Sequence, residues 1–327
     1  MYEAFESGVL PYYAEDFLIY MDSILSKSKN TIHEYYYDLL MFFRFMKLRR
    51  KMVSPEIPFM EIPVSDFCVS DLAAITLTDL YAFLNYINRE RNDQPATRAR
   101  KVACLRSFFK YASNKANLIA QNPAFELESP KKTKRLPKYL QLEESKALLN
   151  SIEGDFKERD YCMITLFLNC GMRLSELVGI NLSDIRGDTL VVTGKGAKER
   201  TIYLNKACLN AISAYLHVRP KLSEEDGAAP LFLSKRKKRI SPKTVQYTVK
   251  KYIRMSNLDP TKYSTHKLRH TAATLMYTYG EVDIRTLQEI LGHESVATTE
   301  IYTHINNAML KDAVNKNPLA DFGQEDS

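Results

Sequence analysis

The sequence predicts a mainly α-helical protein of two domains, with a small antiparallel sheet in the second domain. Three observations support this prediction. Apolar residues recur at helical spacing through much of the 327-residue chain. A stretch rich in proline and basic residues interrupts that pattern at residues 121–138. Between residues 189 and 204 the period changes to that of a β-hairpin around a glycine-rich turn.

Residues 1–120 are predicted to form a helical domain. The stretch "NTIHEYYYDLLMFFRFMKLRRK" places Ile32, Leu39 and Phe43 on one helix face, which we interpret as core. Thr31 is predicted to cap this helix, and Thr78 to cap the helix "DLYAFLNYINRER". Between them, residues 51–70 contain three prolines and are expected to form a loop.

A third helix is predicted in "QPATRARKVACLRSFFKYASNK". Its basic residues fall away from the apolar face, so we expect them to be available to phosphate groups; they are Arg98, Lys101 and Arg106. Two basic runs lie further along, and we assign the same role to their members Lys131, Lys132, Lys134, Arg135, Lys235, Arg236 and Lys237. With a net charge of +7, the two runs favour a polyanionic partner. No basic amphipathic helix with an aromatic face accompanies them, so nucleic acid is favoured over a membrane surface.

The range 121–138 is interpreted as a basic linker that lies against this partner, and residues 139–327 as a second domain. In that domain "LEESKALLNSI", "ERDYCMITLFLNCG" and "RLSELVGI" are predicted helices. The hairpin follows, with strands at 189–192 and 201–204. Helices are expected to resume after Pro242 and to continue to about Lys316, where Ile305, Met309 and Ala313 form an apolar stripe.

Histidines are concentrated near the end of the chain. Of six in total, His266, His270, His293 and His304 stand in "STHKLRHTAATLMYTYG" and "LGHESVATTEIYTHI". His266 and His270 have the spacing of a zinc pair, but Lys267 stands where a zinc protease has its glutamate. No further ligand follows at close spacing, so we predict that no metal is bound.

Phosphoryl transfer uses the same residue types. Guanidinium and imidazole groups can stabilise negative charge on the non-bridging oxygens, and tyrosine can attack phosphorus in line. A proton donor can protect the leaving alkoxide. The sequence offers Arg173, Arg269, Lys195 on the hairpin turn, and Tyr302 nine residues after His293.

Four motifs, "CGMRLSELVGI", "TGKGAKER", "STHKLRHTAAT" and "LGHESVATTEIYTHI", resemble those of the tyrosine recombinase (phage integrase) family, and most closely its Xer-type branch. The segments "ATRARKVACLRSFFKYA", "NLIAQNP" and "LPKYL" resemble the family's core-binding domain and linker. The resemblance implies a SAM-like helical core-binding domain, followed by an α+β catalytic domain of the DNA breaking-rejoining type.

The resemblance also implies a role for each site residue. Tyr302 would attack the scissile phosphate and form a 3′-phosphotyrosine, and Lys195 would protonate the 5′-oxygen. Arg173 and Arg269 would clamp the phosphate. The remaining roles are donation to the phosphate by His293, assistance in proton transfer by His266, and orientation of Arg173 by Glu176. His270 and His304 are interpreted as structural. No metal, ATP or other cofactor is implied.

The implied function is site-specific recombination of double-stranded DNA at an inverted-repeat site, through a Holliday junction. The partners would be a homo-tetramer, or a hetero-tetramer with a related recombinase, and the C-terminal stripe would dock on a neighbouring protomer. Chromosome dimer resolution, integration of a mobile element and DNA inversion all remain open. Two alternatives also remain, an architectural DNA-binding protein without catalysis and a monomeric type IB topoisomerase.

The remaining composition indicates a cytoplasmic protein. The sequence has no apolar run long enough to span a membrane and no signal-peptide pattern at its start. Its five cysteines show no CxxC spacing, so we interpret them as reduced core residues; they are Cys68, Cys104, Cys162, Cys170 and Cys208.

Overall fold

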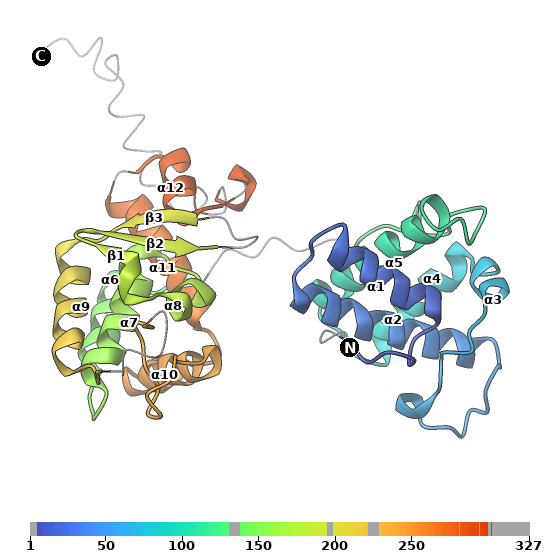
Figure 1. The fold of residues 1–327 in the computed structure, drawn as a ribbon, viewed down its shortest axis with the longest axis horizontal. Helices are drawn as coiled ribbons and strands as arrows, with labels where there is room; N and C mark the ends of the chain where they lie inside the picture. Colours follow the sequence, from blue (N-terminus) through green and yellow to red (C-terminus); the bar gives the residue numbers. More distant parts are fainter. Residues whose placement is uncertain are drawn as a thin grey trace, which may run out of the picture. The chain divides into compact units, whose positions relative to one another are not determined.

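The computed structural model describes residues 5–130, 138–194, 199–221, 229–280, 282–293, 295–299 and 302. The chain divides into two compact units, Met1–Lys134 and Arg135–Ser327. Each unit has its own hydrophobic core. Figure 1 shows an all-helical first unit and a second unit in which helices surround a small sheet. The predicted fold class is therefore confirmed.

Unit 1 is built from helices that pack around aromatic side chains (Figure 1). The helices are α1 (Tyr12–Ser23), α2 (Lys29–Arg49), α3 (Val69–Ala73), α4 (Leu77–Arg89) and α5 (Pro95–Asn114), with a short 3₁₀ helix η1 (Phe59–Glu61). Phe43 of α2 packs edge-on against Tyr13 of α1 and Phe108 of α5. The stripe predicted as core on α2 is buried in this cluster.

Two predicted helix caps are wrong by a few residues. Ser28 caps α2, because its hydroxyl accepts the backbone N–H of Thr31. Thr76 caps α4 in a capping box with Asp79. Both helices therefore begin up to three residues earlier than predicted. Each predicted start has a second serine or threonine nearby, and the hydroxyl of either residue could accept an unpaired N–H of the first helical turn.

Two sequence interpretations of unit 1 are corrected by burial. Lys101 was expected to face DNA, but it is 4% exposed and its Nζ lies 2.9 Å from Asp38 Oδ1. A buried ammonium requires such a partner, so Lys101 belongs to the core of the unit. Cys68 is exposed rather than buried, whereas the other four cysteines are buried.

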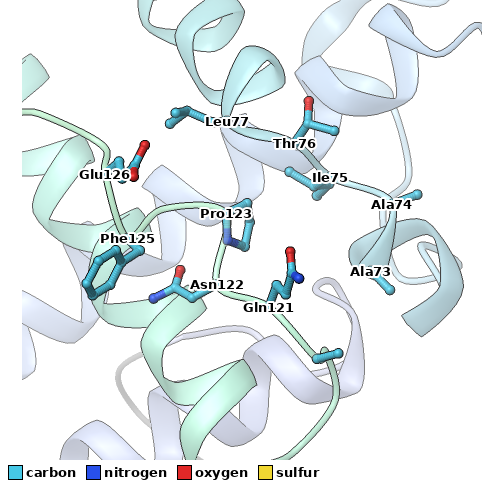
Figure 2. Close-up of a pocket in the computed structure, with 11 residues that line it drawn as sticks. Ala73, Ala74, Ile75, Thr76, Leu77, Gln121, Asn122, Pro123, Phe125 and Glu126 are labelled. Atoms are coloured by element: carbon cyan, nitrogen blue, oxygen red, sulfur yellow. The ribbon is translucent and has the colours of Figure 1, made fainter.

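Unit 1 also contains a pocket of about 650 Å³ beside the start of α4 (Figure 2). Its lining comes from residues 73–77 and 120–126, and none of the predicted site residues belongs to it. Exposed Phe125 stands at one side and Thr76 at another. The pocket carries one ionisable side chain, Glu126, so the chemistry expected from the sequence is not located there.

Unit 2 is larger and contains the sheet. Its helices are α6 (Leu142–Asn150), α7 (Lys157–Cys170), α8 (Leu174–Gly179), α9 (Lys206–Val218), α10 (Pro242–Met255), α11 (Thr265–Tyr279) and α12 (Ile284–Leu291), with 3₁₀ helices η2 (Leu182–Asp184) and η5 (Val296–Thr298). The strands β1 (Ile185–Arg186), β2 (Thr189–Thr193) and β3 (Glu199–Tyr203) form one antiparallel sheet in the order β1-β2-β3. The hairpin is confirmed, with Val191 paired to Thr201. The sequence analysis missed α9 and β1.

Helix α7 lies at the centre of unit 2, between α9 and α11. Most of its side chains are buried, including Met163, Leu166 and Phe167. Because α7 is buried, its C-terminal end is a fixed point in the unit. That end leads directly into the segment that carries Arg173.

Several predictions lie outside the described residues. They concern Lys195 on the hairpin turn, four basic residues of the linker (Lys131, Lys132, Lys134 and Arg135), His304, and the C-terminal stripe of Ile305, Met309 and Ala313. Among the described helices, none has the length and apolar character needed to cross a membrane.

Candidate active site

The site begins at the turn between α7 and α8. Gly171 ends α7 in the left-handed region, with φ of +59°. A Cβ atom at this position would lie 2.7 Å from the Leu291 side chain, so glycine allows α12 to approach closely. Two residues later Arg173 stands at the N-cap of α8. The turn thus places Arg173 beside the C-terminal end of α12.

Glu176 is the centre of a charged cluster. It is 2% exposed, and its carboxylate accepts both the backbone N–H of Arg173 and its Nη1, each at 2.7 Å. Arg200 Nη2 donates to the same carboxylate at 3.0 Å, and Arg269 Nη1 lies 3.9 Å away. Burial raises the pKa of Glu176, but the hydrogen bonds from Arg200 and Arg173 lower it more, so the net shift is downward. Glu176 is therefore ionised at neutral pH.

The cluster keeps an excess of positive charge. Three guanidinium groups, those of Arg173, Arg200 and Arg269, surround one carboxylate. Arg269 is buried, and burial followed by the charge of Arg173 lowers its pKa to about 10. Arg269 therefore remains charged at neutral pH. One carboxylate cannot neutralise three guanidinium groups, and the cluster is partly shielded from water. The cluster therefore favours the binding of a multiply charged anion.

The C-terminal end of α12 holds the three arginines in position. Consecutive backbone carbonyls accept from different guanidinium groups, Ile290 from Arg200, Leu291 from Arg269 at 2.7 Å, and Gly292 from Arg173 at 2.6 Å. The last carbonyls of a helix have no partners within the helix and carry its negative partial charge, so cations are favoured there. Arg269 also donates to the carbonyl of Gly171 at 2.7 Å. One helix end therefore fixes the geometry of the whole cluster.

His293 follows directly from this helix end. Gly292 adopts φ of +63°, and the chain then turns so that the backbone N–H of His293 donates to the carbonyl of Gln288 at 3.1 Å. The Nδ1 of His293 lies 2.9 Å from Oγ1 of the buried Thr299. Burial, then the charges of Arg269 and Arg173, lower the pKa of His293 to about 4. The ring is neutral at neutral pH, and among the described residues no hydrogen-bond partner of its Nε2 is found.

Tyr302 lies against the first turns of α11. Its side chain is 1% exposed, and its hydroxyl lies 2.7 Å from Nδ1 of His270. The Nε2 of His270 lies 3.1 Å from the Nε2 of His266. Burial raises the pKa of Tyr302 to about 12, whereas it lowers that of His270 to about 4 and also lowers that of His266. The three side chains are neutral and form a continuous hydrogen-bonded chain.

The structure brings together most of the residues that the sequence singles out. Arg173, His266, Arg269, His293 and Tyr302 all belong to unit 2 and surround the Glu176 cluster. Among the basic residues predicted to contact DNA, Arg106 is exposed and Arg98 donates to Asn88. Lys235, Arg236 and Lys237 are exposed on the turn before α10.

Two site residues were missed by the sequence analysis. Arg200 stands in the quoted motif "TGKGAKER", but its pairing with Glu176 depends on how the sheet packs against α8, which contacts β2. His270 was assigned a structural role, yet it is the side chain that contacts the Tyr302 hydroxyl. The available signal was its spacing, since His270 lies one helical turn after His266 and therefore on the same face.

A metal centre is not found in the part of the chain that the structure describes. Its histidine, cysteine and carboxylate side chains form no group of three that could hold an ion. Two pockets of about 510 Å³ lie in unit 2. One of them is lined by His266 with Lys243, Gln246, Tyr247 and Lys250 of α10.

Comparison with known sequences gives a consistent result. Residues 138–309 match the Phage integrase family. The chain is 61% identical to Tyrosine recombinase XerC of Caldanaerobacter subterraneus subsp. tengcongensis, over 94% of this chain and 86% of that protein. It is 36% identical to Tyrosine recombinase XerD of Proteus mirabilis, over 73% of this chain and 77% of that protein.

Solved structures have the same fold. A XerH site-specific recombinase bound to a palindromic difH substrate, in a post-cleavage complex, matches with a TM-score of 0.70 and 23% identity over 93% of this chain and 83% of that one. A λ integrase dimer bound to a COC′ core site matches with a TM-score of 0.62 and 19% identity, over 87% and 96% of the two chains. Because both sequence identities are below 25%, these matches show a shared fold only.

Proposed function

Because the chain belongs to the Phage integrase family and is a Xer-type tyrosine recombinase, we propose that Tyr302 is its nucleophile and that the arginine cluster binds the scissile phosphate. The protein is an enzyme of site-specific DNA recombination. The observation that supports the residue assignment is that three arginines converge on buried Glu176, while the buried Tyr302 lies within the field of Arg269 and contacts His270 through its hydroxyl. Phosphodiester cleavage by a phenol needs groups that bind the anionic phosphate and groups that accept the phenolic proton. The arginines can serve as the first and the histidines as the second.

In the proposed reaction Tyr302 attacks phosphorus in line and the 5′-oxygen leaves. Arg173 and Arg269 bind the non-bridging oxygens, whose charge increases in the transition state. His293 donates a hydrogen bond to the phosphate from Nε2. This nitrogen is available because Nδ1 is the one that contacts Thr299. Lys195 protonates the leaving oxygen. The product is a 3′-phosphotyrosine, which keeps the phosphodiester energy for rejoining, so the proposed reaction uses neither a metal ion nor ATP.

The remaining assignments are proposals of the same kind. Unit 1 is a core-binding domain and unit 2 the catalytic domain, and both contact the DNA duplex. Four protomers, of this chain alone or with a related recombinase, exchange strands at an inverted-repeat site through a Holliday junction. The 61% identity to Tyrosine recombinase XerC supports chromosome dimer resolution as the biological role, and therefore a place in the cytoplasm.

The test uses a suicide DNA substrate. A duplex that the full chain selects from a random pool is mapped for cleavage and then nicked close to the cleaved bond, so that the covalent adduct accumulates. Wild-type protein in EDTA should give an adduct that survives denaturing electrophoresis. Tyr302→Phe should bind this duplex with unchanged affinity and give no adduct, because only the nucleophilic oxygen is removed. An adduct with the phenylalanine variant, or none with the wild type, would refute the assignment.

A further inference from the structure

The hydroxyl of Tyr302 contacts His270, whereas the resemblance assigns proton transfer to His266. The Tyr302 hydroxyl lies 2.7 Å from His270 Nδ1, and His266 is reached through the other nitrogen of His270 at 3.1 Å. We propose that His270 is a catalytic residue of strand cleavage, which accepts the phenolic proton of Tyr302 and relays a proton to His266. The proposal rests on the proposed role of Tyr302 as nucleophile.

The hydrogen-bond pattern gives the relay its direction. Within the described part of the chain, His270 Nδ1 is the one hydrogen-bond acceptor that the Tyr302 hydroxyl contacts. A phenol that donates to Nδ1 requires the proton of the neutral His270 ring to be on Nε2. That N–H then donates to Nε2 of His266, whose own proton is on Nδ1. Each donor in the chain faces an acceptor.

The cleavage step then balances. The O–H bond of Tyr302 breaks as its oxygen bonds to phosphorus, and the proton passes to His270 Nδ1. At the same time the proton on His270 Nε2 passes to His266 Nε2. The bond from phosphorus to the 5′-oxygen breaks, and that oxygen takes its proton from the general acid, proposed to be Lys195. His270 ends neutral, and His266 ends as an imidazolium ion. Rejoining runs the same steps in reverse.

A relay fits the surroundings of His270 better than storage of the proton on this ring. His270 is faced by His266, Lys267 and Arg269 of α11, and by His293 from the turn after α12. Burial and these groups disfavour a positive charge on His270, whose pKa is about 4. Because the pKa of Tyr302 is about 12, full transfer before attack is strongly disfavoured. The proton must move while the bond to phosphorus forms.

The far end of the relay is better suited to the charge. His266 lines a pocket of about 510 Å³ at the N-terminal end of α11, together with Lys243, Gln246, Tyr247 and Lys250 of α10. Burial and the charges of Lys267, Arg269 and Arg173 lower the pKa of His266, and a DNA phosphate in this pocket would offset these charges and stabilise an imidazolium ion. The relay thus places the positive charge on His266, away from the buried Tyr302.

The test measures single-turnover adduct formation on the suicide duplex described above, with His270→Ala and His270→Asn. Alanine removes both nitrogens. Asparagine keeps an acceptor close to the position of Nδ1 but cannot take up a proton. Both variants should slow adduct formation by about 10² to 10⁴-fold at saturating DNA, the usual contribution of a general base. Their affinity for DNA should be unchanged.

Two controls separate this role from others. His217→Gln alters an exposed histidine of α9 that contacts the carbonyl of Ser213, and it should cleave at the wild-type rate. A 5′-bridging phosphorothiolate, whose thiolate leaves without acid help, should rescue Lys195→Ala but neither His270 variant, because His270 acts on the nucleophile. With His270→Ala the cleavage rate should rise steadily with pH as hydroxide replaces the base. With wild-type protein it should be flat from neutral to mildly alkaline pH.

The alternative is that His270 holds Tyr302 in a resting position. In that case His270→Ala would cleave as fast as wild type or faster, and the proposal would be refuted. Rescue of the His270 variants by the phosphorothiolate would also refute it. His270→Asn, which is polar and fits the same space, provides the comparison if alanine unfolds the protein. Absence of an adduct with wild-type protein would instead count against the proposed function.

Discussion

At the scale of single residues, Arg200 shows how the anion site is kept in shape. Its guanidinium group joins the carboxylate of Glu176 to the carbonyl of Ile290. Because Glu176 in turn binds Arg173 through two hydrogen bonds, Arg200 acts through a neighbour on the arginines that we propose bind the phosphate. We interpret it as a positioning residue.

This interpretation predicts that Arg200→Ala reduces the cleavage rate at saturating DNA more than it reduces DNA affinity. The variant leaves Glu176 buried with fewer donors, and the unfolding free energy should fall by about 1–3 kcal/mol. Arg200→Lys should restore part of the stability but little of the rate, because an ammonium cannot bridge two acceptors as a guanidinium fork does. Adduct kinetics and urea unfolding measure the two effects.

Arg186→Ala is the matched control, since this arginine is exposed on β1. It should match wild type in both measurements. A loss of DNA affinity with an unchanged rate in Arg200→Ala would instead place Arg200 among the residues that contact DNA.

At the scale of elements, the C-terminal end of α12 organises the site. It is amphipathic, with Leu287 and Leu291 buried and a left-handed glycine after its last turn. Three of its terminal carbonyls bind arginines, and the next residue is His293. Any change in the ending of this helix should therefore affect the clamp and the histidine together.

Gly292→Ala tests this dependence. A left-handed conformation costs a non-glycine residue about 1–2 kcal/mol. Here an added Cβ would also lie 2.7 Å from Cδ of Arg200 and 3.8 Å from Nη1 of Arg173. We expect a loss of stability beyond the backbone cost and slower cleavage, measured by thermal unfolding and adduct kinetics.

Gly187→Ala supplies the control for the backbone cost alone. Gly187 has nearly the same φ, +60°, and an added Cβ would meet no atom within 4 Å. The Gly187→Ala variant should lose only the free energy that a left-handed backbone costs a non-glycine residue, and it should keep the wild-type cleavage rate. Equal effects of the two substitutions on the rate would show that the contacts of Gly292 are unimportant.

At the scale of the whole molecule, each unit carries its own core and the candidate site is contained in unit 2. The core of unit 1 is rich in aromatic residues, and that of unit 2 is built around α7. Units of this size bury enough apolar surface to fold alone. The full chain should therefore tolerate division at the unit boundary.

We predict that residues 1–134 and 135–327, the two units, each unfold cooperatively when produced separately. The fragment 135–327 should keep the contact of Tyr302 with His270, since every residue of that contact belongs to it. Its affinity for DNA should be lower than that of the full chain, because the contacts of unit 1 are lost. Calorimetry and circular dichroism measure folding. Failure of either fragment to fold would show that its core depends on the other unit.

The sequence by itself determined the helical character and the family, and it predicted a division near residues 121–138. Helical spacing is a local property, and four motifs of fixed residue types identify a family without coordinates. It also indicated Arg173, Arg269, His293 and Tyr302, because phosphate chemistry requires particular side chains.

The tertiary structure decided which side chains meet. Lys101 and Arg106 both carry positive charge on one helix, but packing against Asp38 buries the first and leaves the second exposed. His270 resembles a core histidine in sequence, and its contact with Tyr302 arises because residues 32 positions apart are folded together. Arg200 and Glu176 are brought together in the same way, across 24 positions. Such pairings depend on distances between elements, which no local pattern encodes.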